Sequence, residues 1–234
     1  MPGRSRATSK RSPTPRRSSD PSRPLPPTSL APATLDQHDL ETESTFTGLG
    51  FFDLDLSDRR AESVEFAQCR FHAAALSGSH LNRVKLTDCL VETSNWANLS
   101  THGAAMTRVQ FVDSRMTGLI WADGLLQDVT LEGCRLDLSA WRMATFVAVR
   151  FTDCNLRGAD FTNADLRGAQ FVGCDLTGAQ FHQATMDGTR FRSCVLLDIA
   201  GITSWAGAVV DHADLVALSY ALAGALGIRI ERDT

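Results

Sequence analysis

Several features common in other chains are missing from this sequence. No apolar run approaches the roughly 20 residues that a helix needs to cross a bilayer, and the Arg-rich N-terminus lacks the apolar core of a secretory signal. No proline follows Pro32, so none breaks a regular element beyond that point. Lysine is scarce, with 2 residues against 21 arginines. The missing apolar run and the missing secretory signal lead us to expect a cytoplasmic protein with no membrane association.

The N-terminal region has a composition unlike that of the rest. Residues 1–24 carry seven basic side chains and one acid, a charge of +6, so the remaining chain carries −10. A segment rich in Pro, Ser and Arg buries too little apolar surface to offset its ordering entropy, and residues 1–40 are predicted to be a disordered tail. Its charge suits weak contact with a nucleic acid or another acidic partner. The alternative is a solubilising extension or a misassigned start codon.

The most regular feature of the sequence is a five-residue repeat. Every fifth residue from Phe46 to Leu196 gives 31 positions, here called large slots, and 29 of them hold Phe, Leu, Val, Met or Trp. The exceptions are Ala61 and Thr101. A period of five fits neither the alternation of a strand nor the 3.6 residues of a helical turn. It is therefore the period of a larger coil.

A second register lies two residues before each large slot. From Val64 to Cys194 it has 27 positions, the small slots, and all but Leu99 and Leu119 hold Ala, Cys, Ser, Val, Thr or Gly. Residues two apart on an extended backbone point to the same side, so both slots are predicted to face inward. The corner position, two after each large slot, holds ten of the 17 glycines, as a turn with unusual backbone angles would favour.

Residues 20 apart resemble one another, which sets the size of one coil. The series that starts at Phe51 is mostly Phe, and the series that starts at Leu56 is mostly Leu. All six cysteines occupy small slots at this spacing: Cys69 and Cys89, then Cys134, Cys154, Cys174 and Cys194. Four repeats therefore make one turn of a solenoid whose coils bury their apolar faces by stacking. The thiols are expected to be reduced and to hold no metal, because ligands in a line do not converge tetrahedrally.

Three units match a known repeat closely: Ala159-Asp160-Phe161-Thr162-Asn163, Ala164-Asp165-Leu166-Arg167-Gly168 and Cys174-Asp175-Leu176-Thr177-Gly178. They resemble the pentapeptide-repeat family, whose units read roughly A-[DN]-[LF]-x-x. The resemblance covers about two thirds of the chain. It implies an all-β solenoid, a right-handed quadrilateral β-helix, over residues 41–203.

Two residues depart from the pattern. Arg59 is a charged residue in a small slot and predicts an irregular opening coil. Thr101 predicts a local kink or a polar contact. In register it lies between Leu81 and Trp121, so we favour a third interpretation, in which an undersized residue compensates for an oversized neighbour.

Residues 204–234 lose the register and are predicted to form a cap with a helix and a short strand. Asp211 and Asp214 suit a helix start and Gly227 suits a stop, which places the helix near 212–226 and an extended segment at 228–230. The leucines at 215, 218, 222 and 226 form one stripe, expected to cover the open end of the last coil. Val216 and Tyr220 form a thinner second face. Because the C-terminal helix joins dimers in some pentapeptide-repeat proteins, the resemblance implies a homodimer through these two residues.

No group of residues indicates catalysis. His72 is predicted to lie on a different face from His102 and His182, which stand four coils apart. There is no phosphate-binding glycine loop of Walker type and no nucleophile motif, so we expect no cofactor and no enzymatic activity. The predicted mode of action is protein binding through the outer faces.

The family resemblance also implies a specific partner. Proteins of its quinolone-resistance branch, the Qnr and Mfp types, resemble a B-DNA segment and bind DNA gyrase. By this resemblance, outward acids would stand in for phosphates: Asp113, Asp123, Asp128, Glu132, Asp160, Asp165 and Asp175. Residues 44–203 contain 18 acids and 14 bases, however, a balance of only −4. The alternative is a general interaction scaffold or structural rod with another partner.

Overall fold

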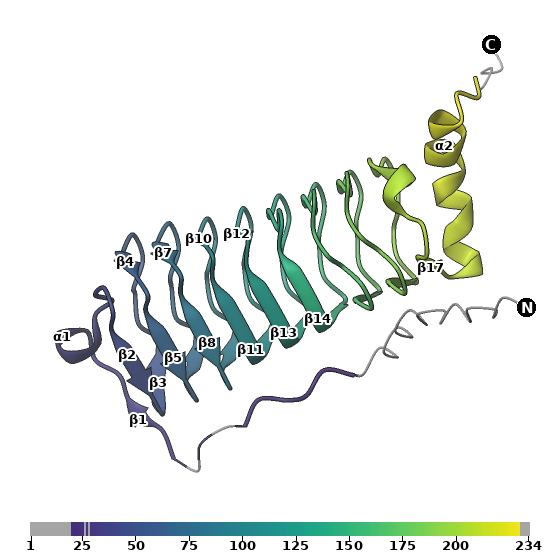
Figure 1. The fold of residues 1–234 in the computed structure, drawn as a ribbon. Coiled ribbons are helices and arrows are strands. Elements are labelled where there is room, and N and C mark those ends of the chain that lie inside the picture. Colours follow the sequence, from purple (N-terminus) through teal and green to yellow (C-terminus); the bar gives the residue numbers. More distant parts are fainter. Residues whose placement is uncertain (1–19, 26, 28, 230–234) are drawn as a thin grey trace, which may run out of the picture.

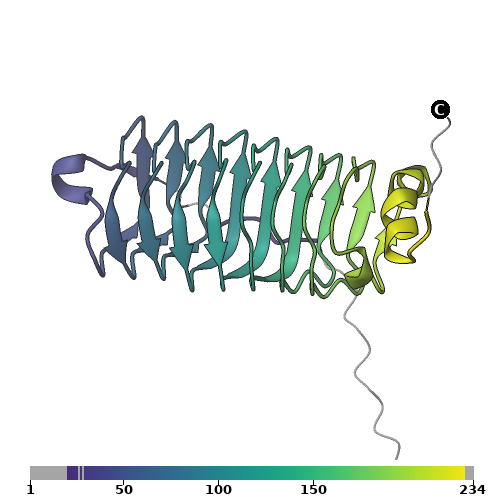
Figure 2. The same cartoon turned by 90° about the horizontal axis from the view of Figure 1, so that it is seen from above.

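The computed structural model describes residues 20–25, 27 and 29–229. These residues form a four-sided parallel β-solenoid with a helix at each end (Figure 1). Figure 2, seen from above, shows the coils stacked as rungs of similar width, with α2 beyond the last coil. The predicted all-β solenoid with a C-terminal helix is confirmed.

Two adjacent sides of the solenoid, A and B, are lined by one 13-stranded sheet. Side A consists of β2 (Thr45–Thr47), β5 (Glu65–Ala67), β8 (Lys85–Thr87) and the first halves of β11 (Ala105–Val112), β13 (Leu125–Glu132) and β14 (Thr145–Thr152). Side B consists of β1 (Ala31–Pro32), β3 (Leu49–Phe52), β6 (Arg70–His72), β9 (Leu90–Glu92), the second halves of β11, β13 and β14, then β15 (Gln170–Val172), β16 (Arg190–Arg192) and β17 (Val209–Val210).

The other two sides have less regular strands. Side C is held by single-residue bridges, which run from Asp55 paired with Ala75 to Asp175 paired with Val195. Side D contains a four-stranded sheet of β4 (Arg60–Glu62), β7 (His80–Asn82), β10 (Ser100–His102) and β12 (Ile120–Ala122), and it continues as bridges to Ala200. The four sides follow one another in chain order, so one coil is one circuit A, B, C, D.

Neighbouring coils pair in parallel with an offset of 20 residues. Phe51 pairs with Phe71, and Phe151 pairs with Phe171, which in turn pairs with Phe191. The predicted coil of four repeats is therefore confirmed.

The core is the column of large and small slots along the axis. Phenylalanine rings stack from coil to coil, with centroid distances of 4.8 Å for Phe51 and Phe71 and 4.9 Å for Phe151 and Phe171. Rings on adjacent sides meet edge to face, as Phe161 and Phe171 do at 5.8 Å. Both geometries are favourable for aromatic pairs. The side chains fill the interior, so the solenoid is a solid rod.

Every corner of the repeat adopts a left-handed backbone. From Gly48 to Asp198, all 31 corner residues have positive φ, and 21 of them are not glycine. Asp and Asn tolerate this region better than other residues, whereas a bulky side chain such as that of Leu138, with φ of 59°, is strained there. The glycine-rich position predicted as a turn is thus confirmed, and the turn is imposed on residues that do not favour it.

The six cysteines lie buried in their small slots as free thiols. Their Sγ atoms donate to backbone carbonyls, for example Cys154 to Leu131 at 3.4 Å and to Thr152 at 3.3 Å. The adjacent thiol and burial both raise the pKa of Cys89 and of Cys154. The predicted placement of the cysteines in two inward ladders is confirmed, and these buried thiols act as packing groups.

Thr101 continues the regular strand β10 and pairs with Trp121, so there is no kink. Its Oγ1 is buried without a hydrogen-bond partner among the described residues, which also rules out the predicted polar contact there. Gly124 lies beside Trp121, and a Cβ at Gly124 would meet the indole Nε1 at 2.4 Å. Trp121 therefore takes space from both Thr101 and Gly124, which agrees with the predicted volume compensation.

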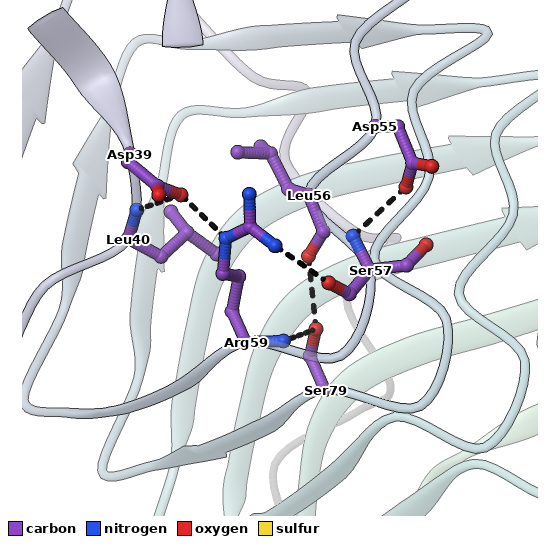
Figure 3. Close-up of polar contacts among 7 residues, drawn as sticks. All are labelled: Asp39, Leu40, Asp55, Leu56, Ser57, Arg59 and Ser79. Atoms are coloured by element: carbon purple, nitrogen blue, oxygen red, sulfur yellow. Dashed lines mark hydrogen bonds and ion pairs between the residues drawn. The ribbon is translucent and has the colours of Figure 1, made fainter. Parts of the chain in front are cut away.

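The opening coil is closed by a short N-terminal cap. Helix α1 (Leu35–His38) precedes the buried Leu40. Figure 3 shows the Arg59 side chain leaving the first coil toward this cap, where its Nε donates to Asp39 Oδ1 at 2.7 Å. The hydrogen bond from Arg59 lowers the pKa of Asp39. The predicted irregular opening coil is wrong, because β2, β3 and β4 pair with β5, β6 and β7 in the regular 20-residue register. Arg59 is tolerated in a small slot because its side chain is only half-buried and reaches out to Asp39.

The predicted boundary of the tail at residue 40 is too late. β1 already pairs with β3, and Ala33 and Leu40 are buried in the core. Residues 20–25 also run beside the solenoid (Figure 1). The basic residues at 4–17, for which we predicted nucleic-acid contact, lie outside the described residues.

In the C-terminal cap, Trp205 stacks on Phe191 at 4.5 Å. It includes two short 3-10 helices, η1 (Ile202–Ser204) and η2 (His212–Asp214), followed by α2 (Leu215–Ala225). The predicted leucine stripe is wrong, because only Leu218 of the four leucines is buried, and it packs together with Ala217 and Ala221. The short strand is also displaced: β17 precedes the helix, no strand forms at 228–229, and residue 230 lies outside the described residues.

Candidate partner-binding surface

Three residues of each repeat face outward: those before and after the large slot, and the corner residue. An Asp or Asn before the large slot accepts a hydrogen bond from the backbone N–H two residues later. The distances are 2.9 Å from Thr162 to Asp160, 3.2 Å from Arg167 to Asp165 and 3.0 Å from Thr177 to Asp175. Asn155 accepts from Arg157 in the same way. The polar residue of the repeat unit thus holds the following turn.

The seven candidate acids do not gather on one side. The 20-residue register places Asp165 on side A, Asp128 at the corner between sides A and B, Glu132 on side B and Asp113 at the corner that follows side B. Asp175 lies on side C, whereas Asp123 and Asp160 lie on side D. The solenoid therefore distributes these carboxylates around its whole circumference.

Asp160, Asp165 and Asp175 are also paired with arginines. Asp160 accepts from Arg142 at 2.5 Å, and Asp175 accepts from Arg157 at 3.1 Å. Asp165 accepts from the neighbouring Arg167, and this hydrogen bond lowers the pKa of Asp165. Burial would raise the pKa of Asp160 and of Asp175, but their hydrogen bonds outweigh it and lower both. These three carboxylates are therefore occupied by intramolecular ion pairs and stabilise the fold.

The other four candidate acids stand at corners or on an open side. Asp128 accepts from the backbone N–H of Ser22 at 2.9 Å, and Asp123 lies 3.7 Å from His102. Asp113 and Glu132 are exposed, and neither makes an ion pair within the described part of the chain. Asp113 and Glu132 belong to successive coils, at the corner after side B and on side B, so they are the candidate acids most available to a partner.

Acidic and basic residues alternate along the sides and neutralise one another. Arg70 pairs with Glu92 at 2.7 Å on side B, and Lys85 pairs with Glu65 at 2.6 Å on side A. Several exposed arginines differ from this pattern. Arg115 and Arg135 are bridged neighbours on side C and, like Arg190 and Arg192 on side B, have no ion pair among the residues the structure describes. The outer surface is therefore mixed in sign.

One acid with a two-bond pairing to an arginine was not among those predicted from the sequence. Asp88, only 8% exposed at the corner between sides A and B, accepts from Arg108 at 2.6 and 2.7 Å. The hydrogen bond from Arg108 lowers the pKa of Asp88. The sequence signal was available, because Asp88, Arg108 and Asp128 alternate in sign at a spacing of 20 residues.

The structure brings no catalytic group together in residues 20–25, 27 and 29–229. His72 lies on side B, and His102 and His182 lie on side D in coils four apart, roughly 19 Å at the spacing of paired strands. Within those residues no three His, Cys, Asp or Glu side chains could hold a metal ion. None of the described helices is both long and apolar enough to span a bilayer.

The last surface of interest is the outer face of α2. Val216 is 77% exposed and Tyr220 is 72% exposed, one helical turn apart. Leu215 and Leu226 are also exposed, at 50% and 76%. The unburied apolar face is therefore wider than the two residues predicted from the sequence.

Comparison with known proteins gives a family match. Residues 104–181 match the model of the "Pentapeptide repeat region". No curated protein matches the chain.

Several solved structures are similar at low sequence identity. A trypsin-treated variant of QnrB1, a plasmid-mediated fluoroquinolone resistance protein, is 15% identical, with 79% of this chain and 99% of that chain covered and a TM-score of 0.27. HetL, a pentapeptide repeat protein involved in heterocyst differentiation regulation in the cyanobacterium Nostoc, is 15% identical, with coverage of 73% and 86% and a TM-score of 0.30. A pentapeptide repeat protein from the thylakoid lumen of Arabidopsis thaliana is 21% identical, with coverage of 56% and 67% and a TM-score of 0.24. Residues 104–181 are therefore a pentapeptide-repeat region, and the same five-residue register and four-sided coils continue on both sides of it.

Proposed function

We propose that the chain acts by binding another protein through the outer sides of its solenoid and catalyses no reaction. One observation carries this proposal: stacked side chains fill the axis, so the chemistry available to a ligand is that of flat rows of outward side chains. A mixed-sign, flat surface suits a protein partner better than a small molecule, which needs a concave site.

The exposed arginines of side C allow a direct test. We expect the immobilised protein to retain a partner that is lost with the Arg115→Glu/Arg135→Glu variant, because charge reversal on the contact side repels it. The matched control is Arg190→Glu/Arg192→Glu on side B, whose two arginines are also exposed. If neither charge-reversal variant loses a protein that the parent retains, the binding proposal fails.

DNA gyrase is the more specific partner that the family resemblance implies. Exposed Asp113, Asp123 and Glu132 support a phosphate-like surface, and the ion pairs of Asp160, Asp165 and Asp175 count against it. The balance favours an interaction scaffold or rod over a DNA mimic. Gyrase is still tested as a partner, because one assay distinguishes a DNA mimic from an interaction scaffold.

A supercoiling assay with fluoroquinolone makes that separation. If the protein mimics DNA, micromolar protein inhibits or protects gyrase, the effect fades as salt rises, and Asp113→Asn/Glu132→Gln weakens it. The matched variant Asp165→Asn should retain the effect, because that carboxylate is occupied by Arg167. No effect of the parent protein at micromolar concentration favours the scaffold.

We also propose that two copies associate through α2. The support is the exposed apolar face containing Val216 and Tyr220, since large apolar side chains clustered on one helix face mark an interaction site. Light scattering coupled to gel filtration should give a dimer mass for the parent protein and a monomer mass for Val216→Glu/Tyr220→Glu. A monomeric parent protein at all concentrations tested contradicts this assembly.

A further inference from the structure

Residues 20–25, here called the strap, run along the corner between sides A and B. The backbone N–H of Ser22 donates to Asp128 Oδ1 at 2.9 Å, and that of Leu25 donates to Asp88 Oδ1 at 3.1 Å. The side chain of Asp20 pairs with Arg150. The strap thus contacts three coils in reverse order, before the chain enters β1 (Figure 1).

Burial follows a period of three along the strap and the described residues just after it. Pro21, Pro24, Pro27 and Leu30 are half-buried, whereas Ser22, Arg23 and Leu25 are exposed. Three residues per turn is the period of a polyproline II helix, whose rise is about 3.1 Å per residue. One side of such a helix therefore faces the solenoid at every turn.

The period of the strap matches the period of the solenoid. Three residues of polyproline II advance about 9.3 Å, and two coils at the strand spacing advance about 9.6 Å. The two donors, Ser22 and Leu25, are three residues apart, and their acceptors are two coils apart at the same corner position. Because the two periods match, backbone N–H groups three residues apart in the strap can each reach a corner residue two coils apart in the solenoid.

The corner itself is built to hold acceptors in place. Arg108 lies between Asp88 and Asp128 in the register and makes two hydrogen bonds to Asp88. This fixes the Asp88 carboxylate, which is 8% exposed, with Oδ1 directed at the strap. An aspartate held in this way, with a peptide N–H on it, is a binding site for extended backbone.

We propose that the corner between sides A and B is a docking site for an extended, proline-rich segment, and that this chain's own strap, residues 20–25, occupies it. The segment binds as a polyproline II helix, read by Asp88 and Asp128 through N–H groups three residues apart. Docking removes both acids from the surface that a partner can reach and ties the N-terminal region across several coils.

Amide hydrogen exchange by NMR on the full-length labelled protein tests this arrangement. The Ser22 and Leu25 amides should exchange about five- to tenfold more slowly than that of Arg23, which has no acceptor in the described structure, as a hydrogen bond of about 1 kcal/mol allows. Equal rates for the three amides would overturn the proposal.

The best variant is Asp128→Gly, because glycine already occupies the same corner at Gly168 and Gly188 with positive φ. It removes the carboxylate and keeps the turn, so the Ser22 amide should accelerate to the rate of Arg23. Asp113→Gly, at the next corner, is the matched control and should change no strap amide. Equal acceleration by both variants would show that the protection is not due to Asp128.

A second variant leaves the solenoid untouched. Pro21→Gly/Pro24→Gly removes the preformed polyproline II geometry, and the Ser22 and Leu25 amides should both exchange faster by the same five- to tenfold. Unchanged protection in this variant would contradict docking as a polyproline II helix.

Discussion

The indole Nε1 of Trp121 lies 2.4 Å from the point where a side chain at Gly124 would begin. Gly124 is the one glycine among the small slots, and its missing Cβ makes room for the largest residue type in a large slot. Position 124 therefore requires glycine for packing, with no contribution from φ.

Gly124→Ala is expected to destabilise the protein by about 1–3 kcal/mol, the usual cost of overpacking a core. The measurement is the free energy of unfolding from a denaturant titration. Gly224→Ala on α2 is the control, because nothing lies within 4 Å of a Cβ there, and alanine favours a helix. A Gly124→Ala protein as stable as the parent would mean that the Trp121 ring relocates at little cost.

Thr101 and Thr189 make a matched pair for one substitution. Thr101→Val removes a buried hydroxyl that has no partner in the described structure, so stability should rise by about 1 kcal/mol. Thr189→Val removes a hydroxyl that donates to the Leu166 carbonyl at 2.7 Å, so stability should fall by a similar amount. Thermal unfolding of both variants shows whether stability rises or falls relative to the parent protein. A change in the same direction for both would contradict the hydrogen-bond assignment.

Leu138 is an exposed leucine in a left-handed corner, with φ of 59°. Leu138→Gly should stabilise the protein by up to about 1 kcal/mol, because relief of the backbone strain exceeds the added entropy of glycine in the unfolded chain. The reverse substitution, Gly178→Ala at φ of 71°, should destabilise it. Denaturant midpoints of the two variants should therefore move in opposite directions.

Asp165 links stability to pH. Its pKa is lowered in the folded state by the hydrogen bond from Arg167, so its contribution is present above the unfolded pKa of about 3.9 and is lost as pH falls through the folded pKa. Asp165→Asn should flatten the fall in stability below about pH 4 while keeping an acceptor for the backbone of residue 167.

Asn155→Asp is the reciprocal test, since Asn155 holds the same turn beside Arg157. This variant should steepen the acid limb of the stability curve. Identical curves for Asp165→Asn and the parent protein would show that the ion pair adds nothing to the fold.

The repeated core was predictable because its register is local and uninterrupted. Each of Phe51, Phe71 and Cys154 could be assigned an inward position from spacing alone, and the 20-residue likeness fixed the coil. The dispersal of the candidate acids over four sides follows from the same arithmetic. The side on which Asp113 or Asp175 lies follows directly from its place within the 20-residue coil.

The ends and the strap could not be obtained in this way, because they depend on long-range contacts. Composition alone predicted disorder for residues 20–25, whereas Asp88 and Asp128, about 60 and 100 residues away, hold them. The buried face of α2 is set by the last coil and not by the leucine pattern, so Leu218 is buried and Leu226 is not.

The corner between sides A and B has a consequence for how such a rod can change length during evolution. Insertion of a single repeat after Arg108 would preserve every inward slot, yet it would rotate all later coils by a quarter turn. Asp128 would then move to a different edge from Asp88, and a straight N-terminal segment could no longer reach both. Growth in whole coils is the only lengthening that leaves this track continuous.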